Sequence, residues 1–121
     1  MRQERINKAY SSLLKLRGYS LPVKKAYAIY KLASSVESAY EFALNEERKY
    51  MADFNGTLNE NGTITFPTPT ECAAFRDKVE ELCDIDADIT VGPVTLTEND
   101  LGEQTITPLD IANLEGFVAF E

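Results

Sequence analysis

The first 17 residues place apolar side chains at the spacing of an amphipathic α-helix. These side chains recur every three or four residues, at Ile6, Ala9, Tyr10, Leu13 and Leu16. Lys8 and Lys15 fall on the opposite face. The pair Arg17-Gly18 is typical of a helix C-terminus, where a basic residue followed by glycine is favoured. The pattern therefore predicts a first helix that ends at Arg17.

A second apolar pattern starts after Pro22 and is much longer. Ser20 is suited to cap this helix, and proline is tolerated in a first helical turn. The apolar positions are Val23, Ala26, Tyr30, Ala33, Tyr40, Leu44, Met51 and Phe54, with no glycine or proline among them. The pattern predicts a helix of about 33 residues, roughly 50 Å long. Two short helices cover such a length only if they lie end to end, so the remaining apolar surface is expected to contact another subunit.

Turn and capping signals organise the rest of the chain. Asn61-Gly62 favours a two-residue hairpin turn between residues 56–59 and 63–66. Thr-Pro-x-acid sequences at 68–71 and 107–110 predict helices beginning there and ending near residues 84 and 115. Residues 84–91 alternate as a half-buried strand does, and the strand resumes at 94–96 after Gly92-Pro93. The expected fold is a single α+β domain over residues 1–121, a hairpin or bundle dominated by the long helix, with a small β-hairpin and a short antiparallel β segment.

Charge divides the chain unevenly. It has 12 basic and 20 acidic residues, for a net charge of −8. Up to Lys31 there are eight basic residues and one acid, Glu4, so this segment carries +7 and the remainder −15. Such a distribution can attract phosphates to the basic end or a basic partner to the acidic end. It can also lead copies of the chain to associate head to tail. Alternatively, the basic segment folds over the acidic remainder.

Few residues in the chain are suited to catalysis. There is no histidine and no glycine-rich phosphate loop. Cys72 and Cys83 are eleven residues apart on one predicted helix, roughly 16 Å along its axis, which is too far for a disulfide. Neither has the basic surroundings that produce a reactive thiolate. We therefore predict a protein that is not an enzyme, with no catalytic residue and no cofactor.

One acidic run resembles the start of a calcium-binding loop. Asp84, Asp86 and Asp88 supply carboxylates at alternate positions. A calcium loop also needs glycine at its sixth position and glutamate at its twelfth, and here these are Ile89 and Thr95. The segment is therefore predicted to be a strand, and no metal site is expected.

Two surfaces are the candidate sites. The first is an interaction or phosphate-binding surface composed of Lys15, Lys24, Tyr27 and Lys31. A nucleotide or nucleic-acid ligand is less favoured, because nucleic-acid binders normally carry excess positive charge. The second is an oligomer interface composed of Tyr30, Glu37, Tyr40, Leu44, Met51, Phe117 and Phe120. Glu37 falls within the apolar arc, so it needs a cationic partner from another subunit or from a returning basic residue.

The order of these motifs resembles a family of short proteins encoded by tailed bacteriophages and prophages. The likeness lies in Ala9-Tyr10-x-x-Leu13-Leu14-x-Leu16, in Leu21-Pro22-Val23-Lys24-x-Ala26-Tyr27, in Phe75-x-x-x-Val79-x-x-Leu82 and in Pro108-x-Asp110-x-x-x-Leu114-x-x-Phe117. It implies a phage-encoded protein made inside a bacterial cell, but it supplies no activity for individual residues.

Two function classes follow from this resemblance and the residues above. One is a structural or assembly protein that forms homo-oligomers or binds other phage structural proteins. The other is an antagonist of host defence that sequesters a nucleotide signal or blocks a nucleic-acid-binding host protein. No apolar run approaches the roughly 18 residues that cross a bilayer, so no membrane partner is expected. The protein is expected in the cytoplasm of the host or in the virion.

Overall fold

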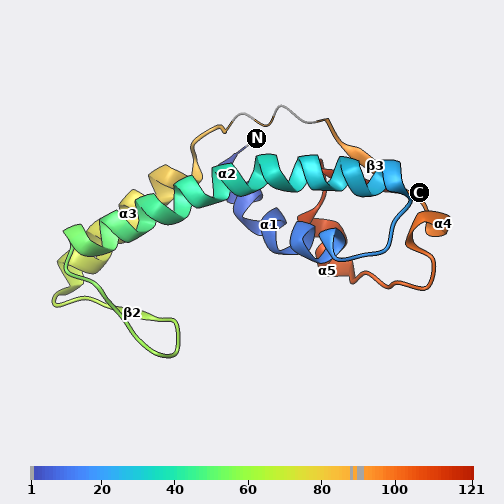
Figure 1. The fold of residues 1–121 in the computed structure, drawn as a ribbon. Helices are drawn as coiled ribbons and strands as arrows, with labels where there is room; N and C mark the ends of the chain where they lie inside the picture. Colours follow the sequence, from blue (N-terminus) through green and yellow to red (C-terminus); the bar gives the residue numbers. More distant parts are fainter. Residues whose placement is uncertain (1, 88, 90–91) are drawn as a thin grey trace.

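One long helix organises the chain in the computed structural model, which describes residues 2–87, 89 and 92–121 (Figure 1). The five helices of the described residues are α1 (Gln3–Arg17), α2 (Val23–Asp53), α3 (Pro69–Cys83), α4 (Glu98–Leu101) and α5 (Pro108–Asn113). Their strands are β1 (Thr57–Leu58), β2 (Ile64–Thr65), β3 (Val94–Leu96) and β4 (Val118–Phe120). The predicted α+β fold dominated by a long helix is confirmed. None of the described helices combines the length and apolar character needed to cross a bilayer.

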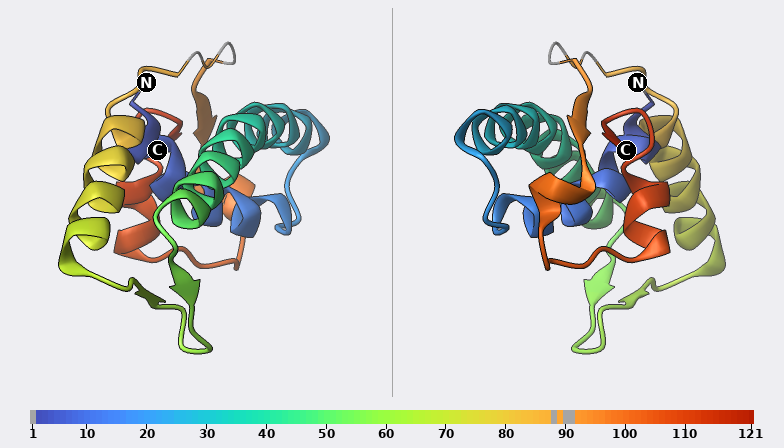
Figure 2. Two further views of the ribbon diagram at one scale, coloured as in Figure 1. Left: turned by 90° about the vertical axis from the view of Figure 1, so that its left-hand side faces the viewer. Right: turned by 90° about the vertical axis from the view of Figure 1, so that its right-hand side faces the viewer.

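Helix α2 runs the length of the molecule, and a different group of elements packs along each of its two halves (Figures 1 and 2). Along its first half lie α1, α5 and the β3–β4 pair, and we call residues 2–36 and 92–121 the head. Along its second half lies α3, with the β1–β2 hairpin at the far end, and we call residues 37–83 the arm. The two flanking groups of elements thus lie end to end along α2, as its length requires.

The helix boundaries largely follow the local signals. Helix α1 ends at Arg17, and the Thr68 and Thr107 side chains accept hydrogen bonds from the backbone N–H groups of Glu71 and Asp110, at 3.3 and 3.2 Å. The predicted Ser20 cap of α2 is wrong. Pro22 occupies the N-cap position, and the Ser20 N–H instead donates to Gln104 Oε1 at 2.7 Å, tying the α1–α2 loop to the segment after α4.

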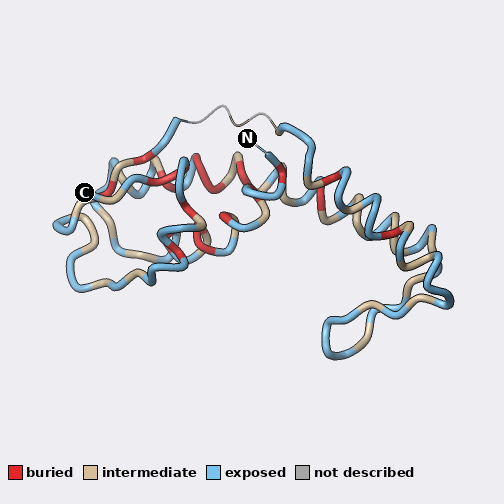
Figure 3. The backbone as a smooth tube through the Cα atoms, turned by 180° about the vertical axis from the view of Figure 1, so that it is seen from behind, coloured by how far each residue is buried: buried red, intermediate tan, exposed pale blue. Residues whose placement is uncertain are grey.

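The core lies mainly in the head (Figure 3). Its larger buried side chains are Ile6, Leu13 and Leu16 from α1, Ile29, Leu32 and Val36 from α2, and Leu96, Leu114, Phe117 and Val118 from the C-terminal third. The predicted apolar face of α2 is wrong in its first half, where Val23 and Tyr30 are exposed. Helix α2 carries two apolar faces there, and α1 and β3 cover the one with the larger aliphatic side chains.

The hairpin pairs Thr57 with Thr65 and Leu58 with Ile64. Its turn is one residue longer than predicted. The Asn59 N–H donates to the Thr63 carbonyl at 2.8 Å, and the Gly62 N–H donates to the Asn59 carbonyl at 3.0 Å, so residues 60–62 form the loop. In such a three-residue loop only the last residue takes a positive φ, and here Gly62 has φ +86°.

The second strand pair is parallel, so the expected antiparallel direction is wrong. Strand β3 pairs with β4 in the register Val94 with Val118. The strands are joined through α4 and α5, and a crossover of this length returns the chain in the same direction. Of the strand predicted over 84–91, residues 88 and 90–91 lie outside the described residues; Asp86 forms an isolated antiparallel bridge with Arg2.

Candidate functional site

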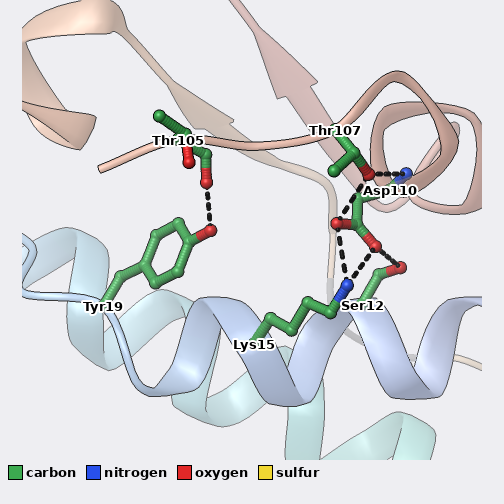
Figure 4. Close-up of polar contacts among 6 residues, drawn as sticks. All are labelled: Ser12, Lys15, Tyr19, Thr105, Thr107 and Asp110. Atoms are coloured by element: carbon green, nitrogen blue, oxygen red, sulfur yellow. Dashed lines mark hydrogen bonds and ion pairs between the residues drawn. The ribbon is translucent and has the colours of Figure 1, made fainter. Parts of the chain in front are cut away.

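A buried carboxylate gathers the densest polar cluster in the described part of the chain (Figure 4). Asp110, the third residue of α5, faces α1. Ser12 Oγ donates to Asp110 Oδ1 at 2.7 Å, and Lys15 Nζ lies 3.1 Å from Oδ2. The Thr107 hydroxyl, which caps α5, also donates to Oδ2 at 2.9 Å. Three elements of local structure, α1, the α5 cap and α5 itself, therefore meet at one carboxylate.

The hydrogen bonds set the ionisation of this carboxylate. The bond from Ser12, followed by those from Lys15 and Thr107, lowers the pKa of Asp110 below its ordinary value of 3.8, against the opposing effect of burial. Asp110 is therefore ionised at neutral pH. Each of its oxygens accepts at least two hydrogen bonds, so the carboxylate has little capacity left for a ligand.

The Ser12-x-x-Lys15 spacing on α1 has the form of a serine nucleophile with a lysine base, but its geometry opposes catalysis. Ser12 is only 1% exposed, and its hydroxyl donates to the carboxylate. A nucleophile must be reachable by its substrate and must pass its proton to a base. The cluster instead pins α1 to α5. Beside it, the Tyr19 hydroxyl donates to the Thr105 carbonyl and ties down the chain before α5 (Figure 4).

The structure separates Lys15 from the other members of the predicted phosphate surface, because its ammonium group pairs with Asp110. The remaining members lie on α2, and we define the α2 patch as Val23, Lys24, Tyr27, Tyr30 and Lys31. Val23, Tyr27 and Tyr30 are 85%, 60% and 56% exposed. The Tyr27 and Tyr30 rings are 6.4 Å apart with 22° between their planes. Lys31 Nζ lies 5.4 Å from the Tyr27 ring centroid, within range of a cation–π contact.

The residues of the predicted oligomer interface separate into two groups. Four of them make contacts within the chain. Glu37 lies 3.8 Å from Arg17, the returning basic residue, and Tyr40 stacks on Tyr10 at 4.1 Å between ring centroids. Phe117 is 2% exposed in the core of the head, and Phe120 pairs with Leu96 in the β4–β3 ladder. The apolar C-terminus thus packs on its own core, and Phe117 is not available as a surface contact.

Of the other three residues, Tyr30 is exposed, and Leu44 and Met51 are half-buried. Tyr30 belongs to the α2 patch, and Leu44 and Met51 line a groove in the arm. We define the arm groove as the hollow of about 390 Å³ between α2 and the hairpin, lined by Leu44, Glu47, Arg48, Met51, Leu58 and Ile64. Its volume falls at the low end of the range for pockets that bind small ligands. Sequence periodicity indicated its α2 wall, but the hairpin wall depends on how the hairpin folds back.

Metal ligands do not gather in the part of the chain that the structure describes. Cys72 and Cys83 are free and half-buried on α3, and burial, with a smaller effect of Glu4, raises the pKa of the Cys83 thiol. Comparisons of the chain with protein-family models, with curated proteins and with solved structures find no match. The resemblance to phage-encoded proteins therefore stays a prediction from the sequence.

Proposed function

We propose that the protein is a phage-encoded structural or assembly protein that is not an enzyme and acts through protein–protein contacts and self-association. The α2 patch is the observation that carries this proposal. It places an aliphatic side chain and two stacked tyrosines on one exposed helix face. Apolar surface gathered in this way is typical of a protein-interaction site, whereas single exposed apolar residues are ordinary. The protein would act in the host cytoplasm or in the virion.

The polar cluster supports the same proposal. Ser12 and Lys15, which have the spacing of a nucleophile and a lysine base, instead hold α1 and α5 together through Asp110. The apolar C-terminal strand is likewise used within the fold. The surfaces that remain, the α2 patch and the arm groove, are suited to contact with another protein.

The first test is the mass of the protein in solution. We expect light scattering at tens of micromolar protein to give a multiple of the 13.5 kDa chain mass. Mass spectrometry of purified virions should then detect the protein if it is a virion component. A single-chain mass throughout that concentration range would contradict self-association. Absence from virions would restrict the proposal to a role in assembly.

The composition of the α2 patch also favours a second candidate, a host-defence antagonist that sequesters a nucleotide signal. Stacked aromatic rings bind bases, and lysines beside them bind phosphates. On this hypothesis, Lys24→Glu with Lys31→Glu abolishes nucleotide binding while the oligomer mass stays unchanged. Binding by the unmodified protein should weaken steeply with added salt, because phosphate contacts release counterions. Lys15 is left unchanged, because replacing it would disturb Asp110. Failure of the purified protein to bind any tested nucleotide would remove this candidate.

A further inference from the structure

We propose that the α2 patch of one copy of this chain docks into the arm groove of a second copy, so that copies join head to tail. The inference rests on the proposed function and adds which two surfaces meet. The two surfaces lie near opposite ends of α2. They differ in composition: one is a convex aromatic and basic face, and the other is a mostly apolar hollow in an acidic arm.

The charges of α2 support this pairing. Its residues 23–36 include three lysines and no acid, a net charge of +3. Its residues 37–53 include five acids and two basic residues, a net charge of −3. The whole arm, residues 37–83, has ten acids and four basic residues, a net charge of −6. The α2 patch, which contains two of these lysines, Lys24 and Lys31, and no acid, is therefore attracted to the arm of a second copy.

Helix stability does not account for the basic first half and acidic second half of α2. A helix is stabilised by acids near its N-terminus and by bases near its C-terminus. Helix α2 has the reverse: its first turn has no acid and contains Lys24, and its last turn has no base and contains Asp53. A role between molecules explains a distribution that the isolated helix disfavours.

The arm groove provides the apolar counterpart to the tyrosines. Leu58 and Ile64 of the hairpin face Leu44 and Met51 of α2 across it. Glu47 lies on its wall and forms no ion pair among the described residues. An entering tyrosine ring would bury apolar surface on both sides, and Lys31 or Lys24 beside it would supply a cation near Glu47.

Two symmetric alternatives fit the structure less well. Pairing of two α2 patches would bring Lys24 and Lys31 of both copies together, and like charges at close range oppose association. A closed antiparallel pair would need the patch and the groove of each copy to face the same neighbour. Tyr27 and Leu44 are 17 residues apart, which corresponds to roughly 260° of helix rotation, or about 100° by the shorter path. The two surfaces thus face different directions, and head-to-tail contact gives rings or open chains.

Two blocking variants test this pairing. Tyr27→Glu with Tyr30→Glu removes the aromatic patch, and Leu58→Glu places a carboxylate at the mouth of the groove. Each replaced side chain is more than half exposed, so both variants should keep the circular dichroism spectrum and thermal midpoint of the unmodified protein. Each variant alone should have the single-chain mass of 13.5 kDa, because each lacks one of the two surfaces.

The decisive measurement is the equimolar mixture of the two variants. The patch-blocked variant keeps an intact groove and the groove-blocked variant keeps an intact patch, so the mixture should form pairs of twice the chain mass and nothing larger. Leu109→Glu on α5 is the matched control. Leu109 is 69% exposed and Leu58 is 62% exposed, but Leu109 lies outside both surfaces, so this control should associate as the unmodified protein does.

The possible failures are distinguishable. If the unmodified protein associates but the mixture stays at the single-chain mass, head-to-tail pairing is wrong and self-association stands. The same conclusion follows if either blocking variant, or both, associates as the unmodified protein does. If the unmodified protein is itself a single chain at tens of micromolar, the proposed function fails together with this inference.

Discussion

Replacing Phe117 by alanine should lower the free energy of unfolding by about 3–5 kcal/mol. The ring is 2% exposed and lies in the head core, immediately before β4. Its loss leaves a cavity in the head core that the surrounding side chains cannot fill without giving up other contacts. A domain of this size is stable by about 5–15 kcal/mol, so the variant should be near the limit of folding. Urea unfolding followed by circular dichroism measures the effect.

Phe42→Ala is the control for this experiment, because Phe42 is exposed on α2 and lies outside the head core. It should change the unfolding free energy by less than about 1 kcal/mol. The pair also tests the sequence-based hypothesis that Phe117 belongs to an oligomer interface. If Phe117→Ala lowered the mass in solution but kept the full unfolding free energy, the ring would be an interface contact and the packing described above would be wrong.

Replacing Asp110 by alanine should destabilise the protein by about 2–4 kcal/mol at pH 7. The substitution leaves the buried Ser12 hydroxyl without its acceptor and deprives Lys15 of its carboxylate partner. It also removes the acceptor of the hydrogen bond that the Thr107 hydroxyl donates at the start of α5. The buried serine dominates the expected effect, because an unsatisfied buried group loses its hydration without compensation, whereas Lys15 is exposed and can return to water.

Asp100→Ala separates the tertiary part of this effect from the local one. Asp100 occupies the same third helical position after a capping threonine, Thr97, but it closes its capping box without a partner from α1. Its replacement should cost about 1 kcal/mol, as the loss of a local cap does. Equal losses for the two variants would mean that the link from Asp110 to α1 contributes nothing to stability.

The pH dependence has a definite sign. Because its hydrogen bonds lower the pKa of Asp110 in the folded state, the stabilisation by this carboxylate is fully present above the ordinary value of 3.8. It is lost as the pH falls through the folded-state pKa, below 3.8. The difference in unfolding free energy between the unmodified protein and Asp110→Ala should therefore be constant from pH 7 to about pH 5 and shrink in stronger acid. A difference that disappears near neutral pH would contradict an ionised Asp110.

Elements that depend on neighbouring residues were predictable from the sequence. The starts of α3 and α5 follow from threonine followed by proline, since both signals act within one helical turn. Helix α4 carries the same kind of signal in Thr97-x-x-Asp100. It was missed because its four residues include no apolar repeat.

Features that depend on distant residues were not predictable. The first half of α2 has two apolar faces, and the packing of α1 and of β3, which follows about 60 to 70 residues later in the sequence, decides which one is buried. The direction of the β3–β4 pair is set in the same way, by the path of the connection through α4 and α5.

In the candidate surfaces, too, the features set by nearby residues were predictable and those set by distant residues were not. The aromatic and basic residues of the α2 patch are close in sequence, and periodicity placed Lys24, Tyr27 and Lys31 on one face. Lys15 was grouped with them on charge alone, but its partner Asp110 is 95 residues away. The hairpin wall of the arm groove was missed for the same reason, because no local pattern indicates where Leu58 meets α2.

The parallel β3–β4 pair also sets the order in which the molecule can be completed as it is synthesised. The arm packs on its own residues and on α1, as where Tyr40 stacks on Tyr10, and all of these precede β3 in the chain, so the arm can pack while later residues are still being added. The head joins α1 to Leu114, Phe117 and Val118, which are synthesised much later. Even Glu121 donates its N–H to the Leu96 carbonyl, at 2.8 Å. A nascent chain therefore presents a packed arm and an open head until β4 has been synthesised.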